Sequence, residues 1–202
     1  MRVPYEDRFH DLEPLLARVE KPSRYIDHEW GTLSSPDAGY RACLVYPDTY
    51  EVGLPNQGIA ILYNILNQQQ GFSCERGYVP WVDMADEMRR AGVPLLSLEG
   101  AAPLASFDVV GFHVPHEMAC TNYLEAMDLA GIPFYASDRG EDDPLVIAGG
   151  PSVYNPEPLA PFFDAILIGE GEESIVEVCR AHQRLRDAGA TREEILRGIA
   201  EV

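Results

Sequence analysis

Short apolar runs that alternate with helix-like segments constrain the fold of this chain more than any other feature. The apolar runs are rich in branched and aromatic residues and lie at 41–47, 72–80, 107–114, 145–151 and 164–172. Helical patterns follow or separate them at 56–71, 83–92, 117–131 and 173–189. Strands that alternate with helices of about 10–15 residues indicate right-handed crossovers and a mostly parallel sheet covered on both faces. We therefore predict an α/β, doubly wound, five-stranded sheet in the flavodoxin-like order 2-1-3-4-5.

Smaller elements surround this sheet in the prediction. A short edge-type strand is expected at 94–100, and a short helix is expected at 158–163. The sheet domain spans 40–189. It lies between an N-terminal helical lead-in with a loop, at 1–39, and a C-terminal helix at 190–202.

Individual residues mark where several of these elements begin, end or attach. Asn56 is the expected N-cap of the helix after the first strand, and Gly71 is its expected stop. Thr191 is the expected cap of the last helix. In the lead-in loop, the large apolar side chains of Tyr25 and Trp30 are predicted to anchor the segment on the main body.

Composition limits the partners that the chain can have. Its 202 residues are 46% hydrophobic, which is enough to bury a sizeable core. Lys and Arg number 15 against 33 Asp and Glu, so the formal charge is −18. Non-specific binding to nucleic acid or to an anionic membrane needs a cationic face, so the acidic charge argues against both functions.

The cysteines and the apolar runs indicate a reduced, cytoplasmic protein. Cys43, Cys74, Cys120 and Cys179 are far apart and form no C-x-x-C pair. Cys43 and Cys179 fall in strand-like and helix-like runs, where thiols act as small hydrophobic groups. The chain start has no apolar signal core, and no apolar run approaches the ~20 residues that a membrane helix requires.

The predicted sheet order also predicts where a ligand binds. In doubly wound sheets, ligands bind beyond the carboxyl ends of the strands, where the first and third strands adjoin. In the first of these loops, Asp48 follows the strand, and Gly53 permits a tight turn before the helix that starts at Asn56. Taken alone, this loop is explained more simply as a connection with an Asx turn, which needs no ligand.

The loops after the third and fourth strands carry histidines and glycines. Pro115 keeps His113 and His116 off a shared helical face, so we expect no metal site and a stacking or hydrogen-bonding role for His113. Gly149 and Gly150 allow a flat or bulky ligand to approach the backbone closely. A tight turn dictated only by packing explains these two glycines as well.

The loop after the fifth strand, Gly169-Glu170-Gly171, opens a helix with further carboxylates. Acidic residues at a helix N-terminus suit its dipole and can be purely structural, and they would repel a phosphate. The chain also has no G-x-G-x-x-G, G-x-x-x-x-G-K-[ST] or G-x-S-x-G motif. Dinucleotide, P-loop and nucleophile-elbow functions are therefore excluded.

Several stretches resemble a known family. "DTYEVG" after the first strand resembles the D-x-H-x-x-G signature of cobalamin-binding domains. "IAGGPSVYNPEPL" and "FFDAILIGEGEESIVEV" resemble the end of the cobalamin-binding-like domain that precedes many radical SAM catalytic domains. "RYIDHEWGTL", "YPDTYEVGLPNQGIAILYNILN" and "RGEDDPLVIAGGP" are similar to one uncharacterised bacterial radical SAM family with this fused domain. The similarity runs from about Lys21 to Val178.

The resemblance implies a cobalamin-binding-like fold and a cofactor at the carboxyl edge of the sheet. Tyr50 stands where cobalamin-binding domains have their cobalt-ligating histidine. A phenol is a poor cobalt ligand, so cobalamin would bind without that ligand, or the site is degenerate. The residues expected to contact the cofactor are Asp48, Tyr50, Gly53, Asn56, His113, Gly149, Gly150, Pro151, Gly169, Glu170 and Gly171.

The resemblance also implies a larger enzyme. Radical SAM proteins bind their iron–sulfur cluster through C-x-x-x-C-x-x-C, which this chain does not contain. We therefore expect the cluster and S-adenosylmethionine in a downstream radical SAM domain of the same polypeptide, which is the expected partner. The chain itself is expected to present cobalamin to that domain without being catalytic. The alternative is a module that has lost its cofactor and positions substrate or a partner protein.

Overall fold

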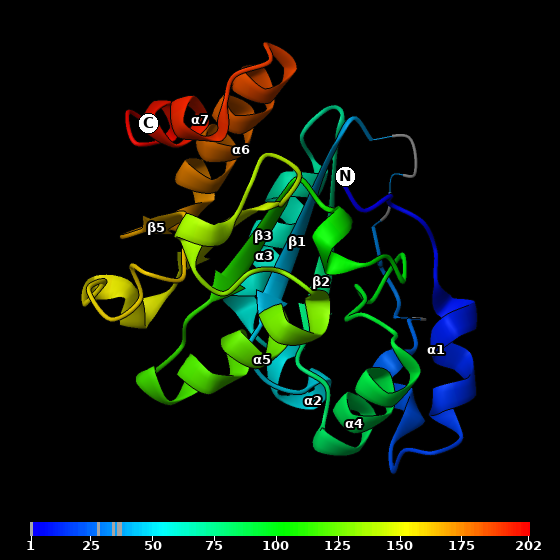
Figure 1. Cartoon of the computed structure of the whole chain (residues 1–202). Coiled ribbons are helices and arrows are strands. Elements are labelled where there is room, and N and C mark those ends of the chain that lie inside the picture. The colour runs from blue at the N-terminus through cyan, green and yellow to red at the C-terminus, as the bar shows by residue number, and fades with distance from the viewer. Residues whose placement is uncertain (1, 28, 34, 36–37) are drawn as a thin grey trace.

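A five-stranded, all-parallel sheet forms the centre of the molecule (Figure 1). The computed structural model describes residues 2–27, 29–33, 35 and 38–202. The strand order is β2-β1-β3-β4-β5, so the predicted doubly wound, flavodoxin-like topology is confirmed. The strands are β1 (Tyr40–Tyr46), β2 (Phe72–Tyr78), β3 (Val109–His113), β4 (Leu145–Gly149) and β5 (Ala165–Leu167).

Helices cover both faces of the sheet. One face packs against α4 and α5, with α1 lying on α4, and the other packs against α3, α6 and α7 (Figure 1). The α-helices are α1 (Phe9–Leu16), α2 (Tyr50–Gly53), α3 (Gln57–Asn67), α4 (Val82–Ala91), α5 (Cys120–Ala130), α6 (Gly171–Asp187) and α7 (Arg192–Ile199). Short 3₁₀ turns are η1 (Pro22–Tyr25), η2 (Leu104–Ser106), η3 (Glu117–Ala119), η4 (Ala136–Asp138) and η5 (Pro151–Tyr154).

The core follows from the apolar character of the strands on both faces. In β1, Cys43 and Val45 point into the layer formed with α4 and α5, and Ala42 and Leu44 point into the layer formed with α3 and α6. A strand buried on both faces reads as a continuous apolar run, which is why the strands were predicted without strict alternation. Cys43 is fully buried, as expected for a thiol that packs as a small hydrophobic group.

The predicted caps at two helix starts are confirmed. The Asn56 side chain accepts a hydrogen bond from the Ile59 amide at 2.9 Å. Thr191 and Glu194 form a reciprocal capping box at the start of α7. Gly71 does not end α3, because the helix stops at Asn67 and Gly71, at φ +81°, makes the turn into β2 instead.

Two predicted elements are wrong. Segment 94–100 is not a strand of the sheet, and only Leu96 forms an isolated antiparallel bridge, with Pro103. Segment 158–163 folds as consecutive turns and not as a helix. Proline lacks the amide hydrogen that helical pairing requires, and Pro156, Pro158 and Pro161 fall in and around this segment.

The lead-in attaches to the body through polar groups as well as apolar ones. The Tyr25 hydroxyl accepts a hydrogen bond from the Trp81 amide at 3.1 Å, so Tyr25 anchors the segment as predicted. The prediction for Trp30 is wrong, because its side chain is fully exposed. The neighbouring Glu29 makes the attachment instead, through its carboxylate. Within the described part of the chain, no helix is both long and apolar enough to cross a membrane.

Candidate functional site

A cavity of about 210 Å³ lies between α3 and α6, beside the carboxyl ends of β3, β4 and β5. The sheet order predicts a ligand where β1 and β3 adjoin, and this cavity is displaced from that point toward β4 and β5, with Leu44 as its lining residue from β1. Its walls are mostly apolar, which suits a flat or bulky organic group more than a small ion. The lining residues are Leu44, Gly58, Ile59, Ile61, Leu62, Gly111, Phe112, His113, Ile147, Ala148, Gly149, Gly150, Leu167, Gly169, Glu170, Gly171, Glu172 and Ile175.

His113 is the imidazole of this crevice. It is the last residue of β3 and is half-buried, and its ring stacks on Tyr46 with centroids 5.4 Å apart and an interplanar angle of 22°. Burial lowers the pKa of His113, so the ring is neutral at neutral pH. Among the described residues, its ring contacts the Tyr46 ring by stacking and makes no side-chain hydrogen bond. The imidazole nitrogens are therefore available to a ligand.

Gly150 brings the fourth loop against His113. Its φ of +124° is a conformation that other residues rarely adopt. A Cβ at this position would lie 2.9 Å from the Val114 carbonyl oxygen and 3.0 Å from His113 Nδ1. Gly149 differs, because a Cβ there would be in ordinary contact, 3.8 Å from the Leu167 carbonyl oxygen. The close packing at Gly150 therefore fixes the His113 ring in the crevice wall.

The fifth loop forms the rim next to α6. Gly169 has φ +117°, and Glu170 is the N-cap of α6 without a side-chain capping bond. A Cβ on Gly171 would be in ordinary contact, 3.5 Å from Leu62, where the start of α6 meets α3. Glu170 and Glu172 are exposed and place carboxylates at the opening, which therefore disfavours phosphate.

The first loop does not join this crevice. The Asp48 carboxylate accepts a hydrogen bond from the adjacent Thr49 amide at 2.7 Å. A Cβ on Gly53 would lie 2.6 Å from the Tyr78 ring, so this glycine is fixed by packing. Asn56 caps α3. In the loop after β4, Pro151 begins η5 and also lies outside the crevice lining. Of the predicted contacts, the crevice lining therefore includes His113, Gly149, Gly150, Gly169, Glu170 and Gly171, but not Asp48, Tyr50, Gly53, Asn56 or Pro151.

Tyr50 is directed toward the β2 edge of the sheet. Its hydroxyl donates a hydrogen bond to Glu29, and its ring packs edge-on against Tyr78 with centroids 5.5 Å apart. Glu29 also accepts a hydrogen bond from Arg76 Nη2 at 2.8 Å. Burial, together with the Glu29 hydrogen bond, raises the Tyr50 pKa to about 12, so the phenol keeps its proton. Tyr50 thus ties the lead-in to the first loop.

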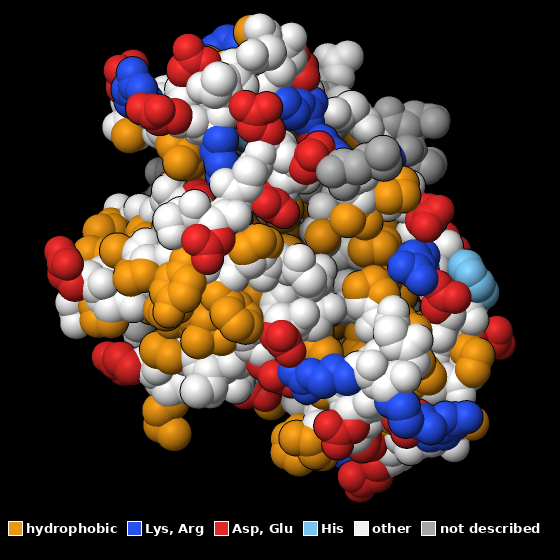
Figure 2. All heavy atoms as spheres, viewed as in Figure 1, with side chains coloured by type: hydrophobic (Ala, Val, Ile, Leu, Met, Phe, Trp, Pro, Cys, Tyr) orange, Lys and Arg blue, Asp and Glu red, His pale blue; other side chains and the backbone are white. Residues whose placement is uncertain are grey.

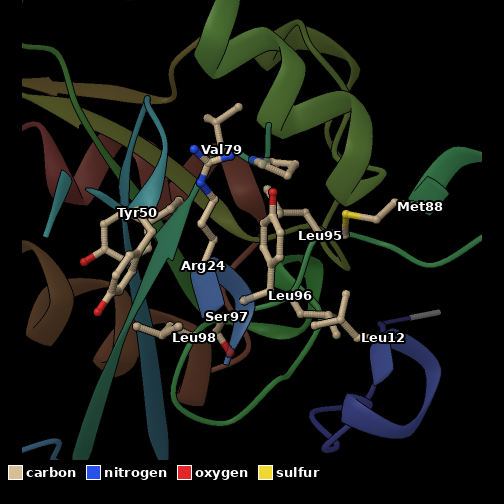
Figure 3. Close-up of a pocket in the computed structure, with 12 residues that line it drawn as sticks. Leu12, Arg24, Tyr50, Val79, Met88, Leu95, Leu96, Ser97 and Leu98 are labelled. Atoms are coloured by element: carbon tan, nitrogen blue, oxygen red, sulfur yellow. The ribbon is translucent and has the colours of Figure 1, made fainter. Parts of the chain in front are cut away.

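A second, small pocket lies beside Tyr50 (Figure 3). Its volume is about 40 Å³, and Arg24 runs through the middle of it. Arg24 Nε donates to Glu51 at 2.8 Å, while its Nη1 is buried without a partner in the described structure. A cavity of this size holds only a few water molecules, which would satisfy Nη1. This pocket is therefore part of the lead-in attachment.

Sequence reasoning missed several residues that line the crevice or support its wall. Tyr46 forms the stack under His113, and Leu62 and Ile175 form the walls contributed by α3 and α6. Tyr46 follows Leu44 by two positions on the same strand, so strand periodicity places it on the crevice side. The contact between α3 and α6 has no local sequence signal, because it joins segments more than 100 residues apart.

The structure is a doubly wound α/β module with a mostly apolar crevice at its carboxyl edge. A family model described as "Radical SAM proteins, N-terminal" matches residues 58–202, which is more than half of the chain. The chain therefore belongs to this family of N-terminal domains of radical SAM proteins. No match among curated proteins is found.

The residues of the crevice fit part of a corrin, the ring of cobalamin, better than the residues of the first loop do. The space beside the Gly150 backbone would be filled by a Cβ, and His113 next to it offers a neutral nitrogen. The apolar walls suit the bulky hydrocarbon surface of such a group. Tyr50 does not suit it, because its hydroxyl is bound to Glu29. His113 is therefore the crevice residue that would offer a nitrogen donor to such a group.

Proposed function

We propose that this chain is the cofactor-binding module of a radical SAM protein and that its crevice holds cobalamin. The observation that carries the proposal is an apolar cavity at the carboxyl edge of a doubly wound sheet, with His113 and Gly150 in its wall. Membership of a family of radical SAM N-terminal domains supports it. When bound, cobalamin would supply cobalt-centred redox or group-transfer chemistry.

The residues of the chain would bind and orient the group. Leu62, Ile147 and Ile175 offer apolar surface that excludes water from the bound face. Glu170 and Glu172 at the rim would accept hydrogen bonds from amide groups, which a corrin carries around its edge. Each of these contacts uses neutral or hydrogen-donating parts of the ligand, so the anionic phosphate of the nucleotide tail of cobalamin would lie away from the acidic rim.

The loops at the same edge supply a docking surface for the downstream radical SAM domain. Every loop that follows a strand presents at least one exposed large apolar side chain. Single exposed apolar residues are ordinary, but a set around one edge marks an interaction surface. Hydrophobic side chains also gather over the segment between α5 and β5 (Figure 2). The exposed apolar residues that follow the strands, here called the apolar loop tips, are Val52 on α2, Val82 at the start of α4, and Trp81, Met118, Tyr154 and Ile168.

A second candidate function is a docking module without cofactor. The specific observation in its favour is that Tyr50, at the position of the usual cobalt ligand, is committed to Glu29. In that case the apolar loop tips would still position the catalytic domain or its substrate.

Binding of hydroxocobalamin separates the two candidates. The purified chain is titrated with the compound and passed over a gel-filtration column, and corrin absorbance is followed in the protein peak. The proposed function predicts a saturable, stoichiometric corrin signal that co-elutes with protein. Elution of all corrin at the small-molecule volume would support the docking module instead.

A further inference from the structure

We propose that His113, and not residue 50, supplies the axial nitrogen ligand to the cobalt of the corrin proposed for this crevice. This inference rests on the proposed function, and it identifies the side chain of the site that would bind the metal. Nε2 would donate its lone pair to cobalt in place of a water molecule, which leaves, and no change of oxidation state is required. The imidazole proton would then lie on Nδ1.

The position of the ring carries the inference. His113 ends the central strand β3 and lines the crevice, where one ring face stacks on Tyr46. Its Nδ1 and Cε1 atoms abut Gly150, since a Cβ there would lie 3.0 and 3.1 Å from them. Nε2 is therefore the ring nitrogen that does not abut Gly150. The ring is held by Tyr46 on one face and by Gly150 at Nδ1 and Cε1, which leaves Nε2 as the nitrogen of a preorganised ligand.

The chemistry of the ring agrees with its position. Burial keeps the imidazole neutral, so no proton must be displaced before the lone pair binds a metal. Imidazole nitrogen is a common ligand of first-row transition metals, whereas a protonated phenol is a poor one. The Tyr50 hydroxyl is in addition held by Glu29, on a loop that does not line the crevice.

Cobinamide provides a direct test, because this corrin lacks the nucleotide base of cobalamin and has no nitrogen of its own to place on cobalt. The chain is loaded with cobinamide in imidazole-free buffer, reduced to Co(II), and examined by electron paramagnetic resonance. The inference predicts that each resolved cobalt line is split into a triplet by one axial ¹⁴N. Labelling the protein with ¹⁵N-histidine should convert each triplet into a doublet.

Variants assign the signal to one residue. His113→Phe preserves a ring to stack on Tyr46 but removes both nitrogens, so the corrin that this variant binds should show no splitting. His113→Gln is the second variant if the Phe form does not fold, as judged by circular dichroism. His116→Phe is the matched control, because His116 is exposed and lies outside the crevice lining; its splitting should be unchanged. Tyr50→His should add no splitting to His113→Phe.

The outcomes distinguish this inference from the proposed function. Cobinamide binding without a histidine-dependent splitting, or with a splitting that survives in His113→Phe, would overturn the role of His113 while the cofactor function stands. Failure of the unaltered chain to bind either hydroxocobalamin or cobinamide would overturn both.

Discussion

At the residue scale, the site depends on side chains held by close packing more than on a sequence motif. Gly150 and His113 come from the ends of neighbouring strands and leave no room for a Cβ between them. Asn56 and Thr191 could be predicted from the sequence, because a cap bonds an amide three residues away. The direction of Tyr50 could not, because its partner Glu29 lies in a separate segment whose path the local sequence does not determine.

Gly150→Ala tests this packing. The substitution forces a Cβ against the Val114 carbonyl and the His113 ring at a φ that alanine rarely adopts. We expect the free energy of unfolding to fall by about 2 kcal/mol, measured by urea denaturation. Gly149→Ala is the matched control, because its Cβ meets only ordinary contacts, and it should change stability far less. Equal effects of the two substitutions would contradict the packing described for Gly150.

At the element scale, the lead-in is attached to the first loop and to β2. Glu29 accepts hydrogen bonds from Tyr50 and Arg76, and β2 is an edge strand that this segment helps to cover. The main strands and helices were predictable because most strands are short apolar runs and the helices carry an apolar period of their own. The turns at 158–163 were not predicted. The helix expected there was based on the apolar pattern, but the prolines in the segment prevent a helix.

Tyr50→Phe tests the attachment. Loss of the hydroxyl removes the hydrogen bond from Tyr50 to Glu29 and keeps the one from Arg76, and it should lower the free energy of unfolding by roughly 1 kcal/mol. Hydrogen exchange should speed up at the lead-in amides, while hydroxocobalamin binding should be unchanged because the loop lies outside the crevice. A large loss of corrin affinity in this variant would show that Tyr50 contacts the ligand after all.

At the scale of the whole molecule, buried polar groups at the amino ends of the strands couple folding to pH. His182 is buried on α6, and its Nδ1 lies 2.7 Å from the Tyr40 hydroxyl. Burial is the chief cause that lowers its pKa to about 4. The unfolded chain protonates this group near pH ~6.5, whereas the folded chain does not until about pH 4.

Stability should therefore fall as the pH drops from about 6.5 to about 4, by up to roughly 3 kcal/mol from this residue. Above pH ~6.5 both states are neutral at this position and the contribution is flat. His182→Asn keeps an acceptor for Tyr40 but cannot titrate, so its stability profile should lack this component. The free energy of unfolding of the unaltered chain and of His182→Asn is measured by urea denaturation between pH 4 and 8. The same pH dependence in both proteins would contradict the role given to His182.

The central claim, that cobalamin occupies the crevice between α3 and α6, is tested most directly by filling that cavity. Gly149→Leu adds a side chain to a lining position without a backbone penalty, because its φ is not positive. Gly39→Leu is the matched control in open space outside the lining. Equilibrium titration with hydroxocobalamin should give binding by the unaltered chain and by Gly39→Leu, and at least a tenfold weaker affinity for Gly149→Leu. Equal affinity in all three proteins would place the corrin elsewhere and contradict the account.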